Sequence, residues 1–403
     1  MKKISIAAAV CAAFAASAAH AQSSVTLYGL VDAGIAYTNN VANGAPGHGS
    51  GRVALQSGNI SGSRFGLRGS EDLGGGLRAV FVLENGFNVN NGALGQGGRM
   101  FGRQAYVGLS SSQFGALTMG RQYDSMVDFV APLSGTAGPF GDSGFAHVYD
   151  NDNLQHSVRL SNSVKFTSND YAGFKFGGVY AFSNSTSFTV SRAYSAGASY
   201  NNGPLRLAAA YLQINGSGAA GTPANSNSVA NQNVAADPSE FKSTAVGGIS
   251  TGNLTADVQR TVGAGVGYTF GPAAVNFVYT HSQFQNTSAF GLNPLSGSTH
   301  FDNYELNVKY ALTPALMLGL MDTFTDGHLN GASGARGGFA TDPKWNQVNA
   351  IARYSLSKRT EVYGEAMYQH AIGHNNTAVM YNAGGNSATS NQVMGAVGIL
   401  SRF

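Results

Sequence analysis

The chain ends in Asn391-Gln-Val-Met-Gly-Ala-Val-Gly-Ile-Leu-Ser-Arg-Phe403, which has the pattern of a single β-strand that closes on an aromatic residue. In steps of two back from Phe403, the residues Ile399, Val397 and Val393 make one face apolar, whereas the other face is mixed. An open sheet edge in lipid would leave backbone groups unpaired, so a strand of this kind is what closing a membrane β-barrel requires. We therefore expect it to pair with the first strand of the mature chain.

The first 21 residues predict a cleaved secretory signal peptide. Lys2 and Lys3 form a short positive region, residues 4–18 are apolar, and Ala19-His20-Ala21 is a small-residue cleavage pattern. A membrane helix is the alternative, but the apolar segment is shorter than the roughly 20 residues that a span needs. We expect one mature domain, residues 22–403, which retains no cysteine for a disulfide.

The composition excludes several classes of protein. Charged residues make up only 11% of the chain, well below the usual globular share of about a quarter. The longest apolar run in the mature chain, residues 315–321, is far too short for a spanning helix. Loss of Lys2 and Lys3 from 23 basic residues leaves 21 against 20 acidic ones, so nothing indicates a nucleic-acid partner.

Alternating segments of about ten residues recur along the whole mature chain. They predict an all-β fold, a transmembrane antiparallel β-barrel of about 16 strands, at residues 25–37, 55–69, 77–88, 101–110, 115–121, 159–167, 174–182, 194–200, 205–214, 261–270, 273–284, 302–312, 316–325, 345–355, 361–370 and 391–403. Every second connection is short, at residues 71–76, 111–113, 169–172, 201–204, 271–272, 313–314 and 357–360. Short turns at one end and long loops at the other are typical of the outer membrane, with the turns in the periplasm.

The alternation also sorts the charges. Phe174 and Phe176 share one register and Lys175 takes the other, and a lysine on the lipid face costs about 2–4 kcal/mol, so Lys175 must face the lumen. The same reasoning places further charged residues inside: Arg64, Arg68, Arg78, Glu84, Arg159, Lys165, Arg206, Glu305 and Lys309. Arg121 is the exception because it shares parity with Leu117 and Met119, and only a bulge or the strand's end would turn it inward.

About sixteen strands enclose an aqueous channel rather than a packed core, so the pattern predicts a pore. The long segment 122–157, the third of the long loops, is expected to fold into the lumen. Its acids would then face the arginine-bearing wall and create a transverse field: Asp124, Asp128, Asp142, Asp150 and Asp152. An ordinary solvated loop is the alternative.

Several segments in order resemble the trimeric general porins of Gram-negative, particularly β-proteobacterial, outer membranes. They are Ser63-Arg-Phe-Gly-Leu-Arg-Gly-Ser-Glu-Asp-Leu-Gly-Gly-Gly-Leu-Arg78, Phe101-Gly-Arg-Gln-Ala-Tyr-Val-Gly-Leu109, Met119-Gly-Arg-Gln122, Ser357-Lys-Arg-Thr360 and the terminal Phe403. The resemblance implies a homotrimer in contact with outer-membrane lipid and lipopolysaccharide, and passive diffusion of small hydrophilic solutes and ions.

The same resemblance assigns roles to single residues. It implies a basic wall of Arg64, Arg68, Arg121 and Arg159, and a Phe403 that is read by the barrel-insertion machinery. Two departures weaken parts of the match: Pro139-Phe-Gly141 lacks the family's glutamate, which leaves Asp142 as a substitute, and Leu400-Ser401 stands where relatives often carry Arg-His.

Other chemistry in the sequence has weaker signals. Gly141-Asp-Ser-Gly144 superficially resembles a serine-protease segment without partner residues, and Gly263-x-Gly265-x-Gly267 lacks the helix of a dinucleotide site. His370 with His374, and Asp150-Asn-Asp-Asn153, lack the context of metal sites. We expect no catalytic residue, cofactor or metal. The predicted function is a general diffusion porin with a mild anion preference; the alternatives are a substrate-selective channel and, less favoured, an adhesin or an enzyme.

Overall fold

The structure is a computed structural model that describes residues 24–43, 47–137, 141, 143–184, 186, 188, 192–215, 256–286, 297–330, 342–374 and 376–403. The predicted signal peptide, Asp142 and most of the 215–259 segment lie outside the described residues.

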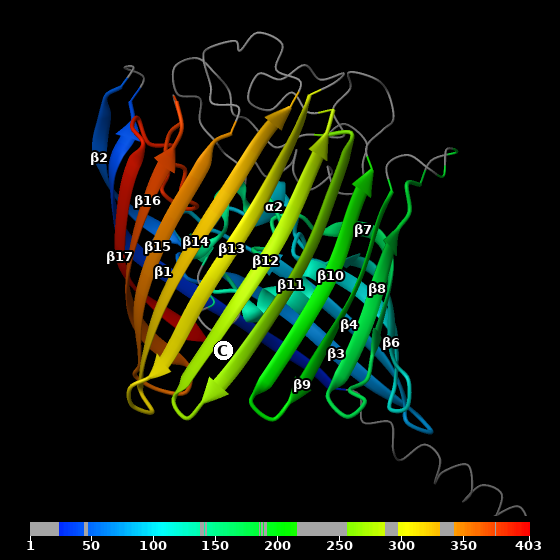
Figure 1. The fold of residues 1–403 in the computed structure, drawn as a ribbon. Coiled ribbons are helices and arrows are strands. Elements are labelled where there is room, and N and C mark those ends of the chain that lie inside the picture. The colour runs from blue at the N-terminus through cyan, green and yellow to red at the C-terminus, as the bar shows by residue number, and fades with distance from the viewer. Residues whose placement is uncertain are drawn as a thin grey trace, which may run out of the picture.

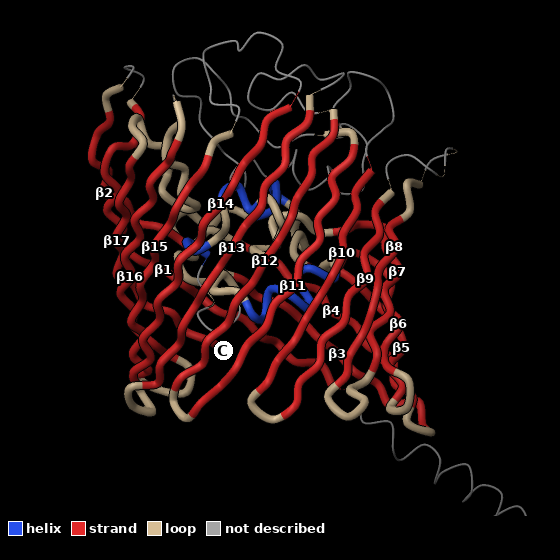
Figure 2. Tube along the Cα trace, viewed as in Figure 1, coloured by secondary structure: helices blue, strands red, loops and turns tan. Residues whose placement is uncertain are grey.

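Seventeen strand segments form one antiparallel sheet that closes on itself as a barrel (Figures 1 and 2). They are β1 (Ser24–Ala42), β2 (Gly49–Ser57), β3 (Arg64–Gly74), β4 (Leu77–Gly86), β5 (Gln104–Ser111), β6 (Gly115–Gln122), β7 (Leu160–Ser168), β8 (Phe174–Ala181), β9 (Ala193–Asn202), β10 (Leu205–Asn215), β11 (Val258–Phe270), β12 (Ala273–Gln285), β13 (Ser298–Ala311), β14 (Leu316–Asn330), β15 (Lys344–Ser355), β16 (Thr360–Ile372) and β17 (Asn391–Arg402).

Segments β2 and β3 together make one barrel strand, so the barrel has the predicted sixteen. β3 pairs with β1 over Ser24–Leu30, and β2 pairs with β1 over Ala33–Ala42. The prediction of one continuous strand at residues 55–69 was wrong, because residues 58–63 leave the ladder. The buried Asp32 carboxylate accepts the N–H groups of Ile60 and Ser61, both at 2.9 Å, and replaces their strand partners.

The barrel closes between its first and last strands, as the terminal sequence predicts. Residues Leu30–Thr38 of β1 pair with Arg402–Met394 of β17. The ladder continues to the end of the chain, where Gly29 N–H donates to the Phe403 carbonyl at 3.1 Å and Phe403 N–H donates back at 3.0 Å. A Cβ atom at Gly29 would lie 2.6 Å from Phe403 Cζ, so the aromatic ring rests on the bare glycine backbone.

The two ends of the barrel differ in the way predicted. Tight turns gather at one end and long connections at the other, as Figure 1 shows. Among the long connections, the β4–β5 loop contains the short α2 (Gly95–Gly98), and residues 123–159 contain η1 (Met126–Val130), η2 (Ala131–Leu133), η3 (Ser143–Phe145) and η4 (Val148–Asp150). None of the helices in the described part of the chain is long and apolar enough to cross a membrane.

The strands alternate between an apolar outer face and a polar or packed inner face. In β14, Leu320 is 55% exposed on the outside, whereas the neighbouring Met321 is fully buried on the inside. The outer face of the terminal strand carries Val397 and Ile399, also exposed, while Leu400 points inward and is buried. This alternation confirms that one register of each strand forms the surface toward lipid.

Residues 123–159, hereafter the third loop, pack against the inner face of the wall. Met126 and Leu133 share a buried apolar cluster with Val179, Leu212 and Val278 of β8, β10 and β12. Farther along the loop, Phe145 packs among buried residues of β14 to β17, and the Tyr149 ring meets the Phe301 and Trp345 rings edge-on. The described part of the loop therefore follows the wall from β8 to β17.

Glycines in β11 make room for this loop. A Cβ atom at Gly263 would lie 2.6 Å from Met126 Cε, and Cβ atoms at Gly265 and Gly267 would each lie 2.9 Å from a Leu133 methyl group. The Gly-x-Gly-x-Gly pattern thus lines an inner strip of wall where larger side chains would displace η1 and η2.

A buried histidine joins the loop to β13. His147 Nδ1 lies 2.6 Å from an Asp152 carboxylate oxygen, and His147 Nε2 lies 3.0 Å from a Glu305 oxygen. Burial alone would lower the pKa of His147, but the negative charges of Asp152 and Glu305 raise it to about 10. Glu305 also accepts the Ser134 hydroxyl at 2.6 Å and the Gly135 N–H at 2.7 Å. An imidazolium between two carboxylates therefore fastens the loop to the wall.

We predict that replacing Leu320 with Arg destabilises the barrel by about 2–4 kcal/mol, because the new charge would sit near the middle of the lipid-facing band. Urea unfolding in lipid vesicles, followed by the fluorescence of Trp345, measures the change. Lys309→Arg, on the inner face of β13, is the matched control and should stay within about 0.5 kcal/mol. Equal effects of the two substitutions would contradict the assignment of faces.

We also predict an alkaline loosening of the third loop. The folded-state pKa of His147 is raised above its unfolded value, so its stabilisation is complete below about pH 6.5 and is lost as the pH rises through about 10. Trp345, the only tryptophan in the chain, contacts Tyr149 of the loop and should report this transition by fluorescence.

The control is His147→Gln, which keeps a polar side chain but cannot carry a proton charge. The difference between the two alkaline titrations isolates His147 from tyrosine and lysine ionisation. Superimposable titrations of the wild type and His147→Gln would contradict the proposed ionic fastening.

Candidate functional site

Three arginines meet on the inner side of the barrel where β3, β5 and β7 begin. Arg64 is the first residue of β3, Arg103 immediately precedes β5, and Arg159 immediately precedes β7. The Arg103 Nη2 atom lies 3.1 Å from His156 Nε2, and the Arg159 guanidinium lies 5.8 Å from the centre of the Tyr123 ring. We call Arg64, Arg103 and Arg159 the arginine cluster.

The third loop places the imidazole of His156 close enough to the arginine cluster for all three charges to affect its pKa. Burial lowers the pKa of His156, and the charges of Arg103, Arg159 and Arg64 lower it further, well below its usual value. His156 is therefore neutral at physiological pH, and it stacks obliquely on Tyr123 with ring centres 5.3 Å apart. Burial is the larger cause of this lowered pKa, and the three arginines act in the same direction because they disfavour a further positive charge.

One carboxylate partly balances the arginine cluster. Glu84 of β4 lies 2.7 Å from Arg103 Nε and accepts the Tyr28 hydroxyl at 3.0 Å. Toward the turn end, the Arg68 guanidinium sits 5.3 Å from the centre of the Tyr28 ring. Among the residues that the structure describes, the charges of Arg103 and Arg64 both act on the Glu84 carboxylate, and Arg68 adds a further positive charge nearer the turns.

Arg121 occupies a different environment from the arginine cluster. Its Nε donates to the Gly102 carbonyl at 2.6 Å, and its Nη1 donates to the Ser161 hydroxyl at 2.9 Å. The β6–β7 register shifts between Gly120 and Gln122, as the sequence requires if Arg121 is to escape its parity with Leu117 and Met119. Its side chain is 8% exposed, and its bonds join the backbone before Arg103 to the start of β7.

The predicted loop acids lie in three kinds of place. Asp124 is fully buried and accepts the Met126 N–H at 2.7 Å and the Asn153 amide at 2.6 Å, and burial raises the pKa of its carboxyl to about 6. Asp150 accepts backbone N–H groups of the same loop, and Asp152 bonds to His147. Asp128 forms an ion pair with Lys165, and Asp142 lies outside the described residues.

The remaining predicted lumen residues line the turn half of the barrel. Lys165 and Lys175 border a recess beside Asp128, described further below, and Arg78 is exposed near the β3–β4 turn. Phe403 seals the closing strand pair, and its ring lies against Gly29 near the backbone of Arg64.

The alternation of residues along the strands did not predict two residues of this site, Arg103 and His156. Arg103 belongs to the segment Phe101–Leu109, but it has the parity of the outward-facing Val107 and Leu109. It nevertheless reaches Glu84 because β5 starts only at Gln104, one residue later, and the period of two does not extend beyond a ladder. His156 carries no sequence signal, because its position depends on the fold of the third loop.

Comparison with known proteins agrees with this architecture. A family model described as Gram-negative porin matches residues 7–374. An outer membrane porin protein of Bordetella pertussis is 34% identical over 389 residues, which cover 91% of this chain and 94% of the relative. Outer membrane porin protein 32 of Delftia acidovorans is 29% identical over 377 residues, which cover 91% and 89%.

Solved structures share the fold at lower identity. The anion-selective porin from Comamonas acidovorans matches 95% of this chain and 100% of its own, with a TM-score of 0.70 and 24% identity. OmpT of Vibrio cholerae matches 96% and 100%, with a TM-score of 0.63 and 15% identity. Together with the closed sixteen-stranded barrel, the family match places this chain among the Gram-negative porins, as a general diffusion channel of the outer membrane.

Proposed function

We propose that this porin favours anions, and that the third loop and the arginine cluster form the constriction that sets this preference. The supporting observation is that Arg64, Arg103 and Arg159 gather around the neutral His156, where Glu84 pairs with Arg103. Three of the loop acids, Asp124, Asp150 and Asp152, are buried and hold the loop together through bonds within it or to His147. One solved structure with this fold is described as an anion-selective porin, which supports the same direction.

Charge at a narrow, low-dielectric passage acts strongly on permeating ions. Field lines are focused where protein walls displace water, and this raises the local concentration of ions of opposite sign. The guanidinium groups remain charged at all relevant pH values, so they provide a permanent field. We keep Arg121 in the proposed basic wall. Its hydrogen bonds to Gly102 and Ser161 would hold the backbone next to Arg103 in place.

The other parts of the proposal concern assembly. We propose a homotrimer that contacts outer-membrane lipid and lipopolysaccharide, made after cleavage of residues 1–21 and recognised through Phe403 by the barrel-insertion machinery. The exposed apolar band around Leu320 and Val397 suits lipid and subunit contacts.

A wet, charge-lined lumen suits transport rather than catalysis, and we propose no enzymatic activity.

We predict that the double variant Arg64→Gln/Arg103→Gln shifts selectivity toward cations. The ratio of chloride to potassium permeability should fall about tenfold, within the range by which charged clefts change local ion concentrations. The measurement is the reversal potential of the trimer in a planar bilayer across a KCl gradient.

Two single variants serve as references. Lys309→Gln removes a lumen charge far from the arginine cluster in the chain and should change the ratio less than about twofold. Arg121→Gln tests whether the charge of Arg121 acts directly on permeating ions or whether its side chain only holds the backbone next to Arg103. An unchanged reversal potential in the double variant would sink the proposed role of the cluster, and current that saturates with salt would favour the alternative of a substrate-selective channel.

A further inference from the structure

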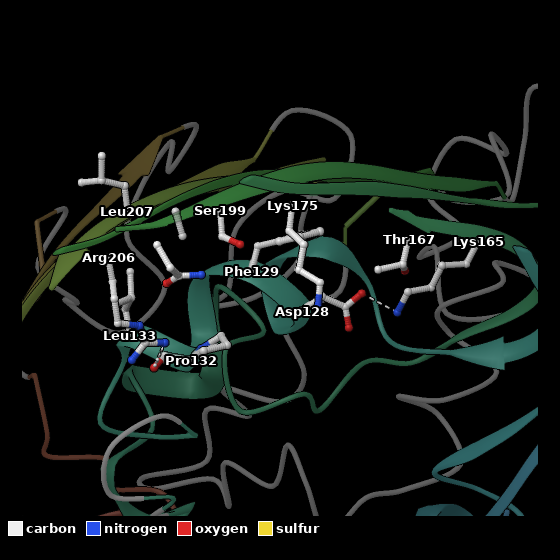
Figure 3. Close-up of a pocket in the computed structure, with 12 residues that line it drawn as sticks. Asp128, Phe129, Pro132, Leu133, Lys165, Thr167, Lys175, Ser199, Arg206 and Leu207 are labelled. Carbon is white, nitrogen blue, oxygen red and sulfur yellow. Dashed lines mark hydrogen bonds and ion pairs between the residues drawn. The ribbon is translucent and has the colours of Figure 1, made fainter. Parts of the chain in front are cut away.

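A second basic recess lies between the third loop and the wall formed by β7, β8, β9 and β10 (Figure 3). Its volume is about 380 Å³, in the range of small-molecule sites. Thr167 and Lys175 flank the β7–β8 turn, and Asn201 and Arg206 flank the β9–β10 turn, so the recess lies toward the turn end of the barrel. It shares no lining residue with the arginine cluster.

The recess is lined by three cationic side chains, Lys165, Lys175 and Arg206, and by one carboxylate, Asp128. Lys165 pairs with Asp128 and also donates to the Tyr123 carbonyl at 3.1 Å. Lys175 points toward the same carboxylate in Figure 3, but it forms no ion pair with any residue that the structure describes. Arg206 donates to the Pro132 carbonyl at 3.4 Å. The recess therefore carries a net charge of about +2, which an anion of charge −2 would neutralise.

The charges are spread over two ends of the recess. Figure 3 draws Arg206 beside Leu133 and Pro132, whereas Lys165 and Lys175 converge on Asp128. Phe129 and Leu133 of the loop supply an apolar lining, and Ser199 and Asn201 add a hydroxyl and an amide. Separated cations over apolar surface match two carboxylates joined by a short carbon chain better than one compact phosphate.

We propose that this recess is a binding subsite for small aliphatic dicarboxylates that pass through the channel. One carboxylate would meet Lys175 and Lys165, the other would meet Arg206, and the carbon chain would lie over Phe129 and Leu133. The proposal rests on the proposed anion-favouring channel, which would bring dicarboxylates to the recess. Lys175 is exposed, so the recess is accessible from the lumen. The subsite would hold dicarboxylates briefly on the turn side of the constriction.

Succinate titration of single trimers in a planar bilayer tests the subsite. At about 0.1 M KCl, succinate added on the turn side should lower the single-channel conductance along a saturating curve. Lys175→Met and Arg206→Met should each raise the half-saturating concentration about tenfold, since each removes one charge-assisted contact. Lys175→Arg keeps the charge and should stay within about twofold of the wild type.

The matched control is Lys309→Met, which makes the same chemical change on the lumen side of β13 and should leave the succinate curve unchanged. Butyrate has the same chain length with one carboxylate and should give no saturating effect, and inorganic phosphate should act more weakly than succinate. Equal curves for the wild type, Lys175→Met and Arg206→Met would overturn the proposal, as would butyrate or phosphate acting as well as succinate.

The reversal potential in KCl, recorded in the same bilayers, separates the two proposals. Anion preference without a saturable succinate effect would overturn the subsite alone. A succinate effect that depends on Lys175 and Arg206, in a channel without anion preference, would overturn the proposed selectivity and leave the subsite supported.

Discussion

Within the hydrocarbon layer there is no water to satisfy a backbone N–H or C=O group, so every such group must find a partner in the protein. The pairing of β1 with β17, down to the exchange of hydrogen bonds between Gly29 and Phe403, meets this requirement at the one place where the chain does not continue. Where the ladder is interrupted, at residues 58–63, Asp32 supplies the missing acceptors from inside the barrel. The outer apolar face, the tight turns and the long loops are all arranged around this closed ring.

A ring of sixteen strands is too wide for its own side chains to fill, and the third loop takes up part of the space. Its position depends on complementary pieces from distant strands: the bare backbone of Gly263, the aromatic rings of Phe301 and Trp345, and the Glu305 carboxylate that receives His147. Buried carboxylates are costly unless hydrogen-bonded or paired, so the loop acids serve its own fold. We propose that the arginine cluster then supplies the positive field at this level of the lumen.

Alternation selects candidate lumen residues because a period of two is a local property of strands. Lys165 and Lys175 follow from their own neighbours in the sequence, and they line the recess beside Asp128. Arg103 could not be predicted in this way, since it lies one residue before a ladder begins. The partners of Asp124 and His147 could not be predicted either, because they come from residues up to 158 positions away in the chain.

The sequence by itself determined the barrel, its closing strand, the end that carries the loops and the residues that avoid lipid, because each follows from local periodicity and the cost of charge in hydrocarbon. Only the tertiary structure decided which charges remain available in the lumen. That outcome depends on how residues 123–159 fold back on the wall, where close contacts with β11 and β13 select one arrangement among many that the same composition allows. Charge pairing acts over a few ångströms in space and has no period along the chain.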